Sequence, residues 1–275
     1  MLRTHIPVLP YVPIAVREQW TNRLISVLLG LVSHPTAYTL FHYFAYTRCT
    51  LYLGRRGGRK HSRDLAHELG HRLELWDVDD IPSLWQSAKT SATFHQARRS
   101  VRLQGRQISE AVLRWVERFL SDGDCSKACG ALSARPPLEP TEELLHSLKT
   151  LHPESQYSVD PAIIPGLENL TAFTVDEVTV ALRSFKKSSS AGPSRMRPCH
   201  ILNLFQAKTA NRLFTVLGSL TTKLANNGFP SSLSPLLCGA SLFALEKPAG
   251  GIRPIACGDL LRRLTSKLVY PEFYL

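Results

Sequence analysis

Residues 244–268 read ALEKPAGGIRPIACGDLLRRLTSKL and contain the signals that decide the fold of the last third of the chain. We interpret Ser241–Glu246 and Ile252–Cys257 as two strands, which the turn-forming sequence Pro-Ala-Gly-Gly joins. Asp259 follows, a residue type that often caps helices, and leucines then recur at helical spacing. This stretch therefore predicts a β-hairpin that leads directly into an amphipathic helix.

A second informative stretch, residues 184–198, reads SFKKSSSAGPSRMRP. Its lysines, serines, glycine and proline predict a basic loop. Before the loop, Thr174 and Glu177 have the spacing of a capping box, which marks the start of a helix. After the loop, the apolar periodicity predicts a second helix over His200–Leu224.

The residues upstream are expected to be mostly helical. From Val16 to Trp115 apolar side chains recur at three- and four-residue spacing, with few of the alternations typical of strands. Residues 133–170 contain several prolines, which predicts a linker with one short helix at Glu142–Leu151. We therefore predict an α+β chain in three parts: a mainly helical basic region at 1–132, a Pro-rich linker at 133–170, and a domain that contains the hairpin at 171–275.

The composition favours a folded, basic protein. The 275 residues include 33 Lys and Arg against 22 Asp and Glu, a formal charge of +11, and 44% are hydrophobic. This hydrophobic content excludes a wholly disordered chain. The basic excess favours a polyanionic partner, through neutralisation of phosphates and release of their counterions. Because many soluble proteins are moderately basic, charge alone leaves a solvated basic surface as an equal alternative.

Signals for targeting and for disulfides are sparse. Residues 1–13 lack the apolar run of a signal peptide, and the apolar segment Leu24–Val32 is far shorter than the ~20 residues that span a bilayer. None of the six cysteines forms a CxxC pair, and we interpret them as reduced core thiols. We expect a protein of the nucleus or cytoplasm that is neither secreted nor in a membrane.

Taken together, the two quoted stretches resemble the opening blocks of the reverse transcriptase of a non-LTR (LINE-like) retrotransposon, an RNA-directed DNA polymerase. The resemblance continues in weaker form upstream, at Gly123, Lys127 and the pair His152-Pro153, and spans roughly residues 114–269. It implies that 171–275 is a partial reverse transcriptase domain, the incomplete fingers portion of a right-hand polymerase fold. RNA and DNA, as template and primer, would then be its partners.

By the same resemblance, Lys247 and Arg253 match the fingers residues that contact the triphosphate of the incoming nucleotide. Gly192 and Arg197 belong to the block that packs near the template, where Arg197 is the expected nucleic-acid contact. A lysine supplies a point charge and an arginine a planar fork for phosphate oxygens, and a stiff hairpin holds both well. Without the resemblance, a hairpin with Lys and Arg is more often a solvated turn. Ser194 stands where these families usually place Asp.

The blocks that make such an enzyme catalytic are absent from these 275 residues. In the family, the palm subdomain has an Asp block and a later YxDD-type block that bind two magnesium ions, which clamp the attacking and leaving oxygens. We therefore expect a truncated fragment that binds nucleic acid and does not polymerise by itself. Mg²⁺ is expected only for the complete polymerase, and the missing palm region of that polymerase would be a further partner.

A basic cluster that follows Tyr52 is another candidate contact with nucleic acid and comprises Arg55, Arg56, Arg59 and Lys60. Such clusters neutralise phosphates, and a neighbouring aromatic ring can stack on a base. A solvated loop before a helix fits the same residues equally well.

The sequence His67-Glu68-Leu-Gly-His71 matches the HExxH pattern of zinc metallopeptidases, in which two histidines bind the metal and the glutamate activates water. Leucines at helical spacing mark the buried face of this helix, which puts both histidines on the polar face. Glu74 and Asp77 stand where the extended motif has Gly and His. A zinc metallopeptidase and a non-enzymatic basic nucleic-acid-binding protein are therefore the alternative functions.

Overall fold

The structure is a computed structural model that describes residues 4–54, 62–103, 110–121, 125–133, 138, 141–151, 170–186, 189–247 and 250–270. The described residues are mainly helical and include one two-stranded sheet, which confirms the α+β class. Packing divides the chain into two compact units. The first comprises Met1–Thr93, Val159–Ser241 and Cys257–Leu275, and the second comprises Phe94–Ser158 and Leu242–Ala256.

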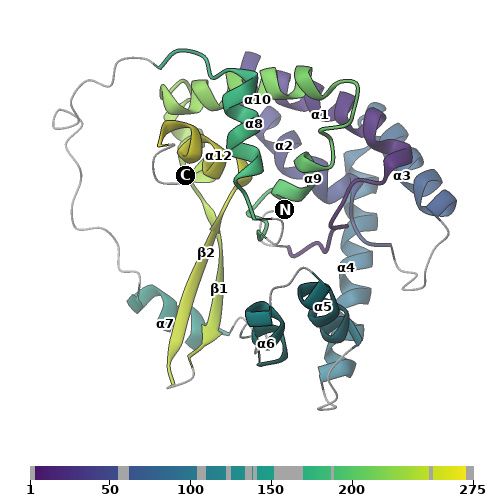
Figure 1. Ribbon diagram of the computed structural model, residues 1–275, viewed down its shortest axis with the longest axis vertical. Helices are drawn as coiled ribbons and strands as arrows, with labels where there is room; N and C mark the ends of the chain where they lie inside the picture. The colour runs from purple at the N-terminus through teal and green to yellow at the C-terminus, as the bar shows by residue number, and fades with distance from the viewer. Residues whose placement is uncertain are drawn as a thin grey trace. The chain divides into compact units, whose positions relative to one another are not determined.

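Three long helices lie side by side in the first unit (Figure 1). α1 (Arg17–Ser33) packs against both α2 (Ala37–Thr50) and α10 (Ala210–Ala225). α1 buries Trp20 and Leu24 together with the other apolar residues of its inner face. The apolar segment that begins at Leu24 is therefore a buried helix, as predicted.

Two predicted helix starts are confirmed in the same unit. α8 (Val175–Arg183) begins at a capping box, in which Thr174 N donates to Glu177 Oε2 at 2.7 Å and Glu177 N donates to Thr174 Oγ1 at 3.3 Å. α12 (Leu260–Val269) begins at Asp259, whose carboxylate accepts from Leu261 N at 3.2 Å. Both helices pack against α10, so these local signals set the start of two core helices.

The single helix predicted over 200–224 is wrong, because the structure has two helices there. α9 (Pro198–Leu202) ends before a series of tight turns, and α10 begins at Ala210. Asn203 lies in the break, and its side-chain oxygen accepts from Val12 N at 3.3 Å. This bond ties the break to a segment 191 residues away in sequence, and apolar periodicity could not reveal it.

The second unit contains the outer part of the hairpin and three short helices. α5 (Glu110–Ser121) packs against α6 (Cys125–Ser133), and α7 (Glu142–Leu151) has the predicted bounds. The strands β1 (Ala240–Glu246) and β2 (Ile252–Gly258) confirm the predicted hairpin, and residues 242–256 of it belong to this unit. The remaining described elements are η1 (Ile14–Val16), α3 (Ser62–Asp77), α4 (Ile81–Leu103), η3 (Ser231–Leu233) and α11 (Ser234–Leu237).

This division differs from the expected boundaries at 132 and 171, because segments from both sides of the expected linker share the core of the first unit. Much of that linker lies outside the described residues. Among the cysteines, Cys49 is a buried core thiol, and burial raises its pKa to about 12. Cys125, Cys129 and Cys238 are exposed, so the expectation of core thiols is wrong for them.

Gly218 of α10 provides a test of this packing, since a Cβ atom there would lie 2.5 Å from Phe173 O. Gly218→Ala should lower the free energy of unfolding by about 1–3 kcal/mol, because the methyl group meets backbone next to the cap of α8. At Gly70 of α3 there is open space, and Gly70→Ala should be neutral or raise stability by up to about 1 kcal/mol. Denaturant unfolding followed by circular dichroism measures both variants, and equal effects would contradict the close approach.

Candidate nucleic-acid interface

The basic loop between α8 and α9 lies against the start of α12, and Gly192 makes this approach possible. A Cβ atom at Gly192 would lie 2.5 Å from Gly258 O and 2.6 Å from Asp259 N, which is closer than any side chain tolerates. Gly192 is buried. Its role in the structure is therefore close packing of two backbone segments, and a direct part in nucleic-acid binding stays a prediction.

The carboxylate of Asp259 joins the loop to two helices. It is 2% exposed and accepts from the Tyr43 hydroxyl of α2, from Ser194 N at 2.9 Å and from Leu261 N. Hydrogen bonds of this kind are what a buried carboxylate needs to replace its lost hydration. Burial and the Asp259 charge raise the pKa of Tyr43 well above its usual value. The Tyr43 hydroxyl is thus kept neutral, as a donor to the carboxylate.

Four successive backbone N–H groups of the loop donate hydrogen bonds. Besides Ser194 N, Arg195 N donates to Gly192 O at 3.0 Å, Met196 N to Ser194 Oγ at 3.2 Å, and Arg197 N to His200 Nδ1 at 3.1 Å. The Ser194 hydroxyl therefore serves as a cap for the chain that follows it. A loop with every amide paired over this stretch has little freedom to rearrange.

Arg48 of α2 also supports the loop. Its side chain is buried in α2, and its guanidinium donates to Pro193 O at 3.1 Å and to Thr4 O at 2.8 Å. Burial lowers the pKa of Arg48 to about 10, although the Asp259 charge acts in the opposite direction. With this pKa the guanidinium stays positive at neutral pH. A buried positive charge therefore donates a hydrogen bond to the loop.

Two more guanidinium groups belong to the loop itself, and we call Arg48, Arg195 and Arg197 the arginine cluster. Burial, with repulsion from Arg48 and Arg197, lowers the pKa of Arg195 to about 10. Arg195 and Arg197 are half-buried, and Arg197 Nε is shielded from solvent without a hydrogen-bond partner. Among the described residues neither forms an ion pair. Electrostatic repulsion among three neighbouring positive charges is unfavourable, and a bound anion would reduce it.

The sequence around the arginine cluster is short of acidic residues. Residues 178–275 contain thirteen Lys and Arg but only three acids, Glu246, Asp259 and Glu272. Of these, the Asp259 carboxylate is buried and already accepts hydrogen bonds from the loop and from α12. Most of the positive excess of the chain therefore belongs to the region that forms the cluster and the hairpin, which favours a polyanionic ligand there.

Lys247 and Arg253 are exposed at the tip of the hairpin, in the second unit. Lys247 N donates to Gly251 O at 3.0 Å, Gly250 N donates to Lys247 O at 3.1 Å, and both glycines have φ near +84°. These bonds place Lys247 opposite Gly251 at the end of the hairpin. The register sets Leu245 opposite Arg253, so Lys247 and Arg253 share one face. That they flank the turn is confirmed, whereas their contact with a nucleotide stays a prediction.

The predicted site residues are thus divided between the units, with Gly192 and Arg197 in the first unit and Lys247 and Arg253 in the second. The predicted basic cluster of Arg55, Arg56, Arg59 and Lys60 lies outside the described residues.

Two of the three HExxH residues, Glu68 and His71, have other partners. His67 and His71 are on the exposed face of α3, as predicted, but Glu68 forms an ion pair with the buried guanidinium of Arg72. The Arg72 guanidinium in turn lies 3.5 Å from the centre of the Tyr52 ring. A carboxylate held in this way is poorly placed to activate a metal-bound water. Within the described part of the chain, no group of three potential metal ligands comes together.

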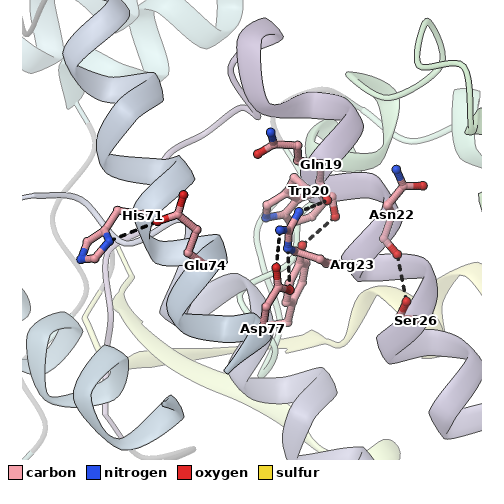
Figure 2. Close-up of polar contacts among 9 residues, drawn as sticks. Gln19, Trp20, Asn22, Arg23, Ser26, His71, Glu74 and Asp77 are labelled. Atoms are coloured by element: carbon pink, nitrogen blue, oxygen red, sulfur yellow. Dashed lines mark hydrogen bonds and ion pairs between the residues drawn. The ribbon is translucent and has the colours of Figure 1, made fainter. Parts of the chain in front are cut away.

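The two acids at the positions of the motif's extension also have polar partners, as Figure 2 shows. His71 Nδ1 lies 3.5 Å from Glu74 Oε2, and Asp77 pairs with Arg23 of α1. The hydrogen bond with Asp77 raises the pKa of Arg23. A pocket of about 300 Å³ between η1, α1 and α3 is lined in part by both histidines and by Glu74, whose partner is His71 of the same helix. The zinc metallopeptidase alternative gains no support from this arrangement.

The sequence alone did not reveal Arg48, Arg195 or the role of Asp259 beyond its cap. A signal was present for Arg48, which is the one charged residue of α2, in the sequence AYTLFHYFAYTRCT. A lone charge in an apolar helix must find polar partners when the helix is buried. The identity of those partners, Thr4 and Pro193, depends on tertiary contacts that no local pattern contains.

Comparisons with known proteins identify no relative. No family model matches the chain, and neither the curated proteins nor the solved structures include a significant match. No helix in the described residues is long and apolar enough to cross a membrane.

His200 is fixed as a neutral imidazole beneath the loop. Because Nδ1 accepts from Arg197 N, the ring proton resides on Nε2, which donates to Leu9 O at 2.8 Å. Burial, with the charge of Arg197, lowers the pKa of His200 to about 4, although the bond to Leu9 opposes this shift. Protonation of Nδ1 would break the bond to the loop.

Acid should therefore destabilise the fold through His200. The unfolded imidazole titrates near ~6.5, so below that pH the unfolded state takes up the proton first. The contribution of the neutral His200 ring to the free energy of unfolding is complete above pH ~6.5 and is lost as the pH falls toward about 4. By pH ~5 the free energy of unfolding has fallen by about 2 kcal/mol. In His200→Gln this contribution is absent, and unfolding free energies measured between about pH 7 and about pH 5 should fall less than in the wild type. Parallel pH profiles would contradict the prediction.

Proposed function

We propose that this chain is a nucleic-acid-binding part of a non-LTR-type reverse transcriptase, an incomplete fingers portion of a right-hand polymerase that does not polymerise by itself. The observation that supports the proposal is the arginine cluster. Its two half-buried members, Arg195 and Arg197, are held on a hydrogen-bonded loop beside Arg48, without acidic partners among the described residues. Arginine matches the geometry of phosphate oxygens, and the resemblance implies a phosphodiester as the ligand.

The proposed binding is to the backbone of RNA or DNA, so it does not depend strongly on base sequence. The two cations of the hairpin, Lys247 and Arg253, would contact the triphosphate of a nucleotide. We assign no magnesium-dependent step to this chain, because the aspartate blocks that bind the metal ions in the resembled family are not among its residues. Polymerisation would require those blocks.

A first prediction concerns Arg197. The wild-type chain should bind single-stranded RNA with an affinity that falls steeply with salt, by a slope of ~0.7 in log K per phosphate contact. Arg197→Gln should make the slope less steep by about that amount. Arg212→Gln removes one positive charge from the exposed face of α10 and should change the slope less. Filter binding or fluorescence anisotropy over a salt series measures all three chains. Binding of the wild type that ignores salt would contradict the proposal, as would equal effects of the two variants.

A second prediction separates the hairpin from the arginine cluster. Arg253→Ala should weaken the binding of a nucleoside triphosphate roughly tenfold, because a charge-assisted bidentate contact is lost. Its affinity for single-stranded RNA should change far less. Titration with a fluorescent nucleotide and with labelled RNA compares the two ligands, with Arg212→Ala as the charge-matched control. Loss of RNA binding without loss of nucleotide binding would refute this assignment.

A further inference from the structure

We propose that α12 has a second phosphate-binding site, formed by Arg263 and Lys267 over the ring of Phe185, which extends the interface of the arginine cluster along a single-stranded nucleic acid. This inference rests on the proposed function. Arg263, Lys267 and Phe185 have no part in the site predicted from the sequence.

The two cations converge on one aromatic ring. Arg263 Cζ lies 5.1 Å and Lys267 Nζ 5.0 Å from the centre of the Phe185 ring. Like charges four residues apart on a helix repel each other, and the negative face of the ring offsets part of that repulsion. Burial and the charge of Arg263 lower the pKa of Lys267. α12 itself contains no acidic residue.

The same pair is connected to the loop of the arginine cluster. Arg263 Nη1 donates to Ser190 O at 2.9 Å, and four residues later Ser194 N donates to Asp259, the cap of α12. Both ends of this loop segment are therefore bound to α12. The cation pair and the arginine cluster lie on two linked segments of the first unit, as the successive phosphates of one strand would require.

The geometry also indicates which part of the nucleic acid is recognised. Phe185 is 6% exposed, with its ring beneath the cations, so it cannot stack on a base. Arg263 and Lys267 are half-buried and within reach of solvent. Where no accessible aromatic ring can stack on a base, an arginine and a lysine contact the phosphates and do not recognise the bases. We therefore expect the same contribution for uridine and adenosine homopolymers.

The test is the salt dependence of RNA binding by the full chain with Arg263→Gln and Lys267→Gln combined. If each cation neutralises one phosphate, the slope of log K against log salt becomes less steep by about 1.4, with roughly tenfold weaker binding at moderate salt. Lys208→Gln with Arg212→Gln removes two charges elsewhere in the same unit and should produce a smaller change. Equal effects of the two double variants would overturn the inference.

A second set of variants separates the loss of charge from a disturbance of the loop. This is needed because Arg263 also donates a hydrogen bond to Ser190 O. Lys267→Gln alone leaves that bond in place and should reduce the slope by about 0.7, while Lys267→Arg keeps the charge and should keep the slope. A slope unchanged in Lys267→Gln would contradict the second site. Failure of the proposed function gives a different result, since the wild type itself would then show no salt-dependent RNA binding.

Discussion

The buried carboxylate of Asp259 is the interaction on which the candidate site depends. It accepts from Tyr43 of α2, from Ser194 of the loop and from the first turn of α12, and it offsets part of the cost of burying Arg48. A buried charge survives only when its hydrogen bonds are satisfied, so these partners fix one another. The absence of a Cβ atom at Gly192 permits the backbone approach that brings Ser194 to the carboxylate.

The hydrogen bonds around Asp259 explain how the chain tolerates the charge repulsion within the arginine cluster. The amides of residues 194–197 are all hydrogen-bonded, so Arg195 and Arg197 cannot separate from Arg48 by rearrangement of the loop. Arg195 even has a φ of +64°, a region that residues other than glycine seldom adopt. Strain and unpaired charge at one place are the features expected of a binding site, in which the ligand supplies the missing interactions.

Local signals predicted the local structure well. The strands around Pro-Ala-Gly-Gly, the capping box at Thr174 and the cap at Asp259 follow from residue types at fixed spacing, and all are confirmed. The sequence did not predict the break at Asn203 or the partners of Arg48, because both depend on contacts with the N-terminal segment, almost two hundred residues away in one case. Arg197 was predicted through the resemblance, whereas its neighbours in the cluster are visible only once the chain is folded.

Amide hydrogen exchange, measured on the free chain and with single-stranded RNA, tests the central claim most directly. We predict slow exchange at residues 194–197 in the free chain, because each of these amides is hydrogen-bonded, and further protection on RNA binding that is concentrated in this loop and α12. Rapid exchange of these amides in the free chain would show that Asp259 does not hold the loop. Protection confined to other parts of the chain would show that the nucleic acid binds elsewhere.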